Sequence, residues 1–179
     1  MPLGDVYLES VLNNFRNMKA TAERAMKQLE FHELQFCPTE ESNSIAHIVK
    51  HMAGNMASRW TDFLTSDGEK STRDRDAEFE DSYISTDEMM EDWKAGWDRL
   101  FGTISKLKSE DLLKIVYIRM EPHSVVQAIE RQIYHLSYHT GQIVYVAKQI
   151  RNSKWKTLTI PRGKSKEFLA EMDKKFKGK

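Results

Sequence analysis

Apolar residues recur at spacings of three and four along four long stretches of the chain, which is the pattern of amphipathic α-helices. A helix of this kind buries one face against its neighbours, so four of them predict an all-α fold, a four-helix bundle. The expected helices cover residues 5–29, 43–64, 85–106 and 124–150. We expect Ser42 or Asn43 to cap the second helix, and Ser85 and Ser124, each three residues before a glutamate or glutamine, to cap the third and fourth. We find no internal repeat and expect a single domain over residues 1–179.

The stretch between the second and third helices, residues 65–85, is polar and charged and has no apolar period. It predicts a long crossover loop with a solvated surface, and the most mobile long segment of the chain. Its aromatic residues Phe79 and Tyr83 leave an alternative open. If they cover a site or a partner surface, the segment is ordered instead.

The stretches beside the last long helix are short. The β-branched and aromatic residues 113–120 predict a short strand, and residues 121–123 a turn into that helix. After the helix, Ser165 is expected to cap a short amphipathic tail helix.

The last long helix carries a polar interruption in its core-facing seam. Gln132, His135, His139 and Gln142 follow one another at spacings of three and four, where leucine would pack better. A buried polar group without a partner costs about 1–3 kcal/mol, so four of them indicate a compensating ligand. Histidines at positions i and i+4 lie on one face of a helix and can bind one metal ion. The seam therefore predicts a metal site at His135 and His139.

The second helix offers a third imidazole. His47 lies nearly opposite the centre of its apolar arc, whereas His51 lies closer to the edge of that arc, so we expect His51 to face into the bundle. No fourth histidine, cysteine or carboxylate occupies an obvious inward position. Three imidazoles leave coordination positions open for water or substrate.

Two segments in this order resemble the DinB/YfiT-like superfamily of metalloenzymes: HIVKHMAGN on the second helix and YHLSYHTGQIVYVAK on the fourth. The resemblance covers nearly the whole chain, and WTDFLTSDGEK and the late IPRG look like a bacterial branch of unknown function. It implies a divalent metal, nickel or zinc, bound by one histidine of the second helix and by both histidines of the HxxxH pair. The matching positions are His51, His135 and His139.

The resemblance also implies an activity. Some members of the superfamily are thiol-dependent S-transferases or isomerases that use bacillithiol, mycothiol or glutathione. We therefore expect a metal-dependent transferase or hydrolase acting on a small molecule, with a low-molecular-weight thiol as a possible second cofactor. Asn55, Gln132 and Gln142 are candidates to orient ligands or substrate, and Arg59 and Tyr138 to contact substrate. The alternative is a non-catalytic, metal-stabilised bundle that acts as a dimeric stress-associated binding protein.

Composition narrows the class of partner. Lys and Arg together number 27, as do Asp and Glu, and this balance does not favour nucleic acid as a partner. No apolar run is long enough to predict a membrane span, and the N-terminus lacks the pattern of a signal peptide. The single cysteine, Cys37, suits a reducing cytoplasm. Outward-facing aromatic residues such as Tyr134 and Tyr145, and the pairing common in this superfamily, favour a homodimer.

Overall fold

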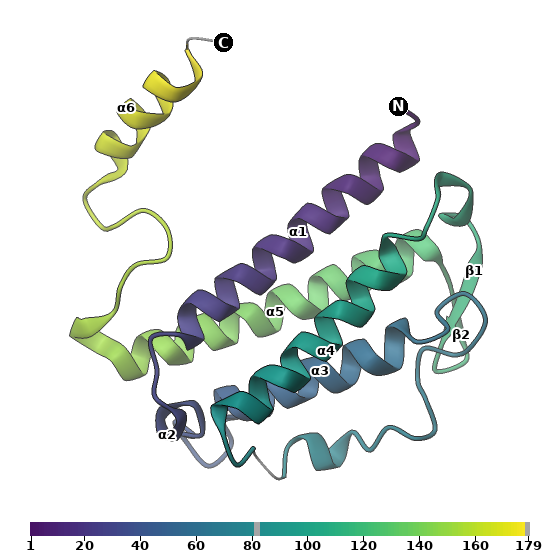
Figure 1. Cartoon of the computed structure of the whole chain (residues 1–179), viewed down its shortest axis with the longest axis horizontal. Coiled ribbons are helices and arrows are strands. Elements are labelled where there is room, and N and C mark those ends of the chain that lie inside the picture. Colours follow the sequence, from purple (N-terminus) through teal and green to yellow (C-terminus); the bar gives the residue numbers. More distant parts are fainter. Residues whose placement is uncertain (81–82, 178–179) are drawn as a thin grey trace.

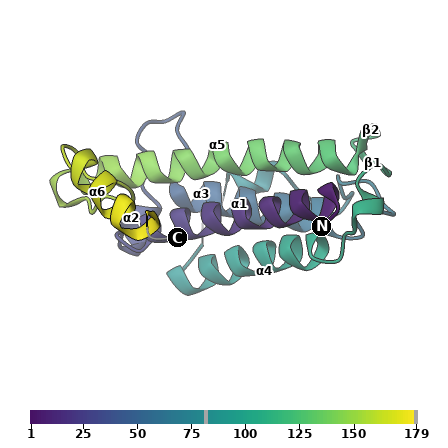
Figure 2. The ribbon, with the colours of Figure 1, turned by 90° about the horizontal axis from the view of Figure 1, so that it is seen from above.

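The computed structural model describes residues 1–80 and 83–177. Four long helices lie side by side along one axis (Figures 1 and 2), and each packs against two others in the cyclic order α1, α5, α3, α4. The prediction of an all-α four-helix bundle is thus confirmed. The α-helices among the described residues are α1 (Leu3–Met26), α2 (Phe31–Leu34), α3 (Ile45–Trp60), α4 (Thr86–Ile104), α5 (Val125–Arg151) and α6 (Ser165–Phe176).

Serine side chains cap three of the long helices. The Oγ atoms of Ser85 and Ser124 accept the backbone N–H three residues further on, as the sequence predicted, both at 3.2 Å. The cap of α3 is different from the expected Ser42 or Asn43: Ser44 Oγ accepts the backbone N–H of His47 at 3.1 Å. This capping box holds His47 at the first turn of α3.

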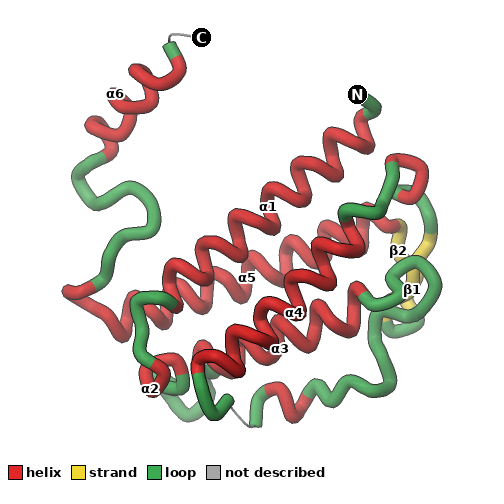
Figure 3. The backbone as a smooth tube through the Cα atoms, in the orientation of Figure 1, coloured by secondary structure: helices red, strands yellow, loops and turns green. Residues whose placement is uncertain are grey.

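A short hairpin closes one end of the bundle (Figure 3), where β1 (Ile115–Ile118) pairs antiparallel with β2 (Glu121–Ser124). The strand expected over residues 113–120 is therefore shorter, and the turn expected at residues 121–123 is wrong. Those residues form the second strand, because the chain reverses two residues earlier.

The reversal occurs at Arg119 and Met120, whose φ angles are 54° and 65°. Non-glycine residues rarely adopt this left-handed conformation without support. The carboxylate of Asp67 provides that support, because it accepts the two backbone N–H groups at 2.8 and 2.7 Å. The crossover between α3 and α4 is consequently tied to the hairpin.

The core is apolar and rich in aromatic residues. Trp93 and Trp97 are fully buried and lie edge to face, with ring centroids 5.5 Å apart, so they belong to the packed core between the helices. No helix in residues 1–80 and 83–177 combines the length and apolar character needed to cross a membrane. The helix α6 stands away from the bundle (Figure 1) and contains no buried residue.

Candidate metal centre

Three histidines from two helices converge at the middle of the bundle. His51 on α3 and His135 and His139 on α5 each offer a ring nitrogen, and these atoms all lie within 4.8 Å of one another. The Nε2 atoms of His51 and His135 are 3.1 Å apart. An ion bound at about 2.0–2.1 Å from each imidazole nitrogen holds two such nitrogens roughly 3 Å apart. The cluster can therefore hold a metal ion with little rearrangement.

The expected choice between the two α3 histidines agrees with this geometry. His51 is 4% exposed and belongs to the cluster, whereas His47 is only partly buried and its Nδ1 lies 3.4 Å from the backbone N–H of Ser44. The reason is the position of each residue around α3: His51 lies closer to the edge of the apolar arc that faces the bundle, whereas His47 lies nearly opposite the centre of that arc.

Hydrogen bonds orient two of the three rings. Nδ1–H of His51 donates to Glu78 Oε2 at 2.8 Å, and Nδ1–H of His139 donates to Gln142 Oε1 at 2.7 Å. Because both acceptors lack a competing proton, the Nε2 atoms of these rings keep their lone pairs, as metal ligation requires. His135 Nδ1 is buried and has no hydrogen-bond partner among the described residues. The surroundings therefore fix the tautomers of His51 and His139 from their outer nitrogens, whereas no described residue binds the outer nitrogen of His135.

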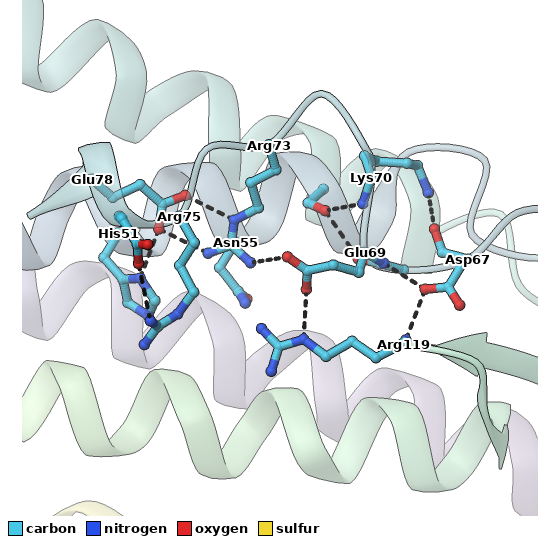
Figure 4. A network of polar contacts seen from close by, with 12 residues as sticks. His51, Asn55, Asp67, Glu69, Lys70, Arg73, Arg75, Glu78 and Arg119 are labelled. Carbon is cyan, nitrogen blue, oxygen red and sulfur yellow. Dashed lines mark hydrogen bonds and ion pairs between the residues drawn. The ribbon is translucent and has the colours of Figure 1, made fainter.

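Glu78 comes from the crossover, at the end of a short 3₁₀ helix over residues Asp76–Glu78. It is held by Arg73, whose Nε and Nη2 donate to its two carboxylate oxygens, both at 2.8 Å (Figure 4). Less than a tenth of either side chain is exposed. The carboxylate also packs against Gly54 on α3, where any side chain would collide with it.

These contacts correct two expectations. The charged crossover is not simply a solvated surface, since its Arg73 and Glu78 are buried against α3. A carboxylate does reach the inward face, although it contacts the outer nitrogen of His51 and is not placed as a fourth ligand. Sequence reasoning missed both residues because a loop without a period gives no signal of which side chain turns inward.

The aromatic residues of the crossover follow the alternative expectation in part. The ring centroid of Phe79 lies 4.9 Å from that of His51, so Phe79 covers the histidine cluster. Tyr83 is 6% exposed and donates its hydroxyl to Asp92 at 3.1 Å. Phe79 thus lies over the site as this alternative expected, whereas Tyr83 contacts α4 instead.

Electrostatics favour neutral imidazoles at this centre. Burial, reinforced by the neighbouring histidines, lowers the pKa of His135 to about 3. Burial also lowers the pKa of His139 to about 4, although its bond to Gln142 acts in the opposite direction. Burial alone would raise the pKa of Glu78, but hydrogen bonds from His51 and Arg73 outweigh it and keep the carboxyl ionised. A divalent ion requires neutral imidazoles, and those of His135 and His139 are neutral well below pH 7.

A cavity of about 210 Å³ opens beside the histidines. His51 and His135 form part of its wall, together with Asn55 and Gln132, which are joined by a hydrogen bond of 3.1 Å from Gln132 Nε2 to Asn55 Oδ1. Arg59, named as a candidate from the sequence, also lines it. The centre therefore faces a space that a small molecule can enter.

The remaining predicted residues lie on the far side of the cluster. Gln142 does not line this cavity and instead holds His139. Tyr138 is 57% exposed, with its ring centroid 5.1 Å from that of His139, so it borders the cluster from outside.

Comparison with known proteins identifies a family and a fold. The family described as "Protein of unknown function (DUF1572)" matches residues 2–164. A search of curated proteins finds no significant match. The crystal structure of "the conserved protein of locus from Enterococcus faecalis" aligns over 83% of this chain and 96% of its own, with a TM-score of 0.61 and 14% sequence identity. At that identity the likeness shows the fold alone.

Proposed function

The chain belongs to the DUF1572 family, and we propose that it is a divalent-metal-dependent enzyme of the DinB/YfiT-like superfamily. The proposal rests on the three-histidine cluster, on the bundle fold and on the resemblance of the α3 and α5 motifs to that superfamily. The metal is nickel or zinc, and the reaction is a thiol-dependent S-transfer or a hydrolysis.

Each residue of the centre has a distinct task in this proposal. His51, His135 and His139 bind the ion through ring nitrogens, while Glu78 and Gln142 hold the outer protons of two rings. A divalent ion in such a site makes a thiol or a water molecule nucleophilic near neutral pH. Asn55, Gln132 and Arg59 line the adjacent cavity and orient the substrate.

The observation that carries the proposal is the cavity. A structural metal site is closed by four protein ligands, whereas a catalytic site keeps an open position. Among the described residues the cluster contains three ligands and no fourth, and two of the three border the cavity. This arrangement supports catalysis over the alternative, a non-catalytic metal-stabilised bundle.

Metal binding is tested by elemental analysis after substitution of single histidines. His51→Ala and His139→Ala should each abolish stoichiometric metal, because two imidazoles alone bind weakly. His47→Gln is the matched control: it keeps an acceptor for the Ser44 cap and should retain the metal. Loss of metal from the control with retention in His51→Ala would overturn the ligand assignment.

Activity is tested with the metal-loaded protein. We would screen bacillithiol, mycothiol and glutathione as thiol donors, and a panel of ester and amide substrates for hydrolysis, with His139→Ala as the negative control. Turnover that disappears in this variant supports the enzyme. Stoichiometric metal without turnover in any assay supports the non-catalytic alternative.

A homodimer and a cytoplasmic location are part of the same proposal. Tyr134 and Tyr145 on α5 are 76% and 72% exposed, which supports a surface available for pairing. Light scattering across a wide concentration range would decide the oligomeric state, and a constant monomeric mass would contradict the dimer.

A further inference from the structure

The cavity beside the histidines is lined by an unusual number of positive side chains. Five arginines contribute to its wall, and no aspartate or glutamate does. They come from α3, the crossover, the hairpin turn and α5, so segments distant in sequence bring them together. The arginines are Arg59, Arg73, Arg75, Arg119 and Arg131.

Four of these arginines have acidic partners behind or beside the cavity. Glu78 and Glu69 bind Arg73, and Glu69 also accepts from Arg119 Nε at 3.1 Å (Figure 4). The exposed carboxylates of residues 76 and 121 lie 3.9 and 3.6 Å from the guanidinium groups of residues 75 and 131. Four carboxylates, two of them exposed, thus face five arginines, and the cavity keeps a net positive charge.

Arg59 differs from the other four. It is 7% exposed, and its Nη1 is buried without a hydrogen-bond partner among the described residues. Burial and the nearby charge of Arg131 lower its pKa to about 10, although the charge of Glu69 acts in the opposite direction, so the guanidinium is still charged at neutral pH. A buried charge without a partner is strongly unfavourable, and proteins normally pair it.

We infer that this cavity binds an anionic group, a phosphoryl or carboxylate group of a small molecule, with Arg59 as its principal ligand. A guanidinium presents two parallel N–H donors that match both groups. An anion there supplies the partner that Arg59 lacks and neutralises the surplus charge of the wall.

The size of the cavity limits the ligand. Its volume of about 210 Å³ is below the roughly 300–1,000 Å³ of pockets for drug-sized molecules. It fits a small anion or the charged end of a larger molecule. Because His51 and His135 share the wall, the bound anion lies beside the candidate metal centre. The idea that this anion is part of a substrate rests on the proposed function. The binding of the anion itself does not depend on that function.

The binding test uses isothermal titration calorimetry with the full chain, both metal-free and loaded with zinc or nickel. The probes are inorganic phosphate and succinate, titrated at a constant ionic strength of about 0.15 M, where exposed charges are largely screened. Saturable one-to-one binding is expected, and the tighter probe identifies whether phosphoryl or carboxylate chemistry is preferred. Absence of binding for both probes in both forms of the protein would overturn the inference.

Substitution separates a built site from general positive charge. Arg59→Met should weaken binding of the preferred probe by about 30-fold or more, the loss expected when one partner of a buried charge pair is removed. Arg16→Met is the matched control, since Arg16 is exposed on α1 and does not line the cavity. Equal affinities in the two variants would contradict the inference.

Thermal unfolding of the ligand-free variants gives a second readout. Arg59→Met should unfold at the same or a higher temperature than the wild type, because it removes an unpaired buried charge and keeps the volume. A purely structural arginine would instead lower the unfolding temperature on replacement. Lower unfolding temperature with unchanged anion binding would assign Arg59 a structural role only.

The same experiments distinguish failure of the inference from failure of the proposed function. Anion binding to the metal-free protein and to His139→Ala, without any metal binding by the wild type, would support the pocket and contradict the metalloenzyme. Metal binding without anion binding would contradict the anion pocket and leave the proposed metalloenzyme standing.

Discussion

The crossover of residues 65–85 and the C-terminal segment of residues 156–177 are alike in sequence in that both are highly charged, although a short amphipathic helix is expected in the second. In the structure they differ. The crossover buries Arg73 and Glu78 against α3 and covers the histidine cluster with Phe79. The tail helix α6 buries no residue and stands away from the bundle.

The difference shows what allows a charged segment to become part of a core. Glu78 is held by two donors on Arg73 and one on His51, and Gly54 leaves room for its carboxylate. In α6, the ion pair of Lys164 with Glu167 is exposed and local. The charges of Arg73 and Glu78 are buried because each has hydrogen-bonded partners beside it, whereas the charges of α6 remain exposed to water.

The largest effect should come from breaking the buried pair. Glu78→Ala leaves Arg73 with only the longer contact to Glu69 at 3.4 Å, and it should lower the free energy of unfolding by about 3 kcal/mol. Glu167→Ala removes the exposed pair of α6 and should change it by less than about 1 kcal/mol. Urea denaturation measures both, and similar losses for the two variants would contradict the comparison.

A methyl group at position 54 should disturb the centre without touching a histidine. In Gly54→Ala the new Cβ overlaps Glu78 Oε1 and would lie 3.0 Å from its Cδ, so the carboxylate must shift, and we expect this shift to weaken its bond to His51. We expect metal affinity to fall about 10–100-fold, as for loss of an outer hydrogen bond to a ligand.

The control for this variant is Gly141→Ala on α5, two residues from His139. A Cβ at position 141 meets no atom within 4 Å, so competition with a chelator should show unchanged metal affinity. Unchanged affinity in Gly54→Ala as well would mean that Glu78 does not support the centre.

The change of stability with pH should come from the buried histidines of the metal centre and not from the tail helix α6. Folding lowers the pKa of His135 to about 3 and of His139 to about 4, below the ordinary value near 6.5. The unfolded chain therefore binds more protons between about pH 6.5 and 4, and the metal-free protein should lose stability as the pH falls through that range.

Chelator-treated samples should show this loss in urea denaturation at several pH values. His135→Gln should reduce the slope of stability against pH, whereas His32→Gln, which changes an exposed histidine, should leave it unaltered. An identical slope in wild type and His135→Gln would show that the buried imidazole does not contribute.

The smallest effect is expected from removing α6. Deletion of the chain from residue 165 onward should change the free energy of unfolding by less than about 0.5 kcal/mol and leave metal binding intact, because α6 has no buried residue. The contacts of Gln28 with Lys156 and of Arg24 with Leu158 remain in this variant. A loss of several kcal/mol would mean that α6 packs against the bundle in solution.

The sequence by itself determined the elements whose signals are local. The 3.6-residue period located the four long helices, and the serine three residues before a glutamate or glutamine located two of their caps. The spacing of His135 and His139 placed both on one face of α5, and the phase of the α3 arc selected His51. In each of these cases the residues that give the signal lie within one or two helical turns of the feature that they predict.

Only the tertiary structure decided which other side chains meet the histidines. Glu78 reaches His51 from 27 residues away, and the arginines of the cavity come from four separate segments. A loop has no fixed period, so its sequence does not state which side chain turns inward. The packing of the crossover onto α3 decides it, at the one position where Gly54 leaves space for a carboxylate.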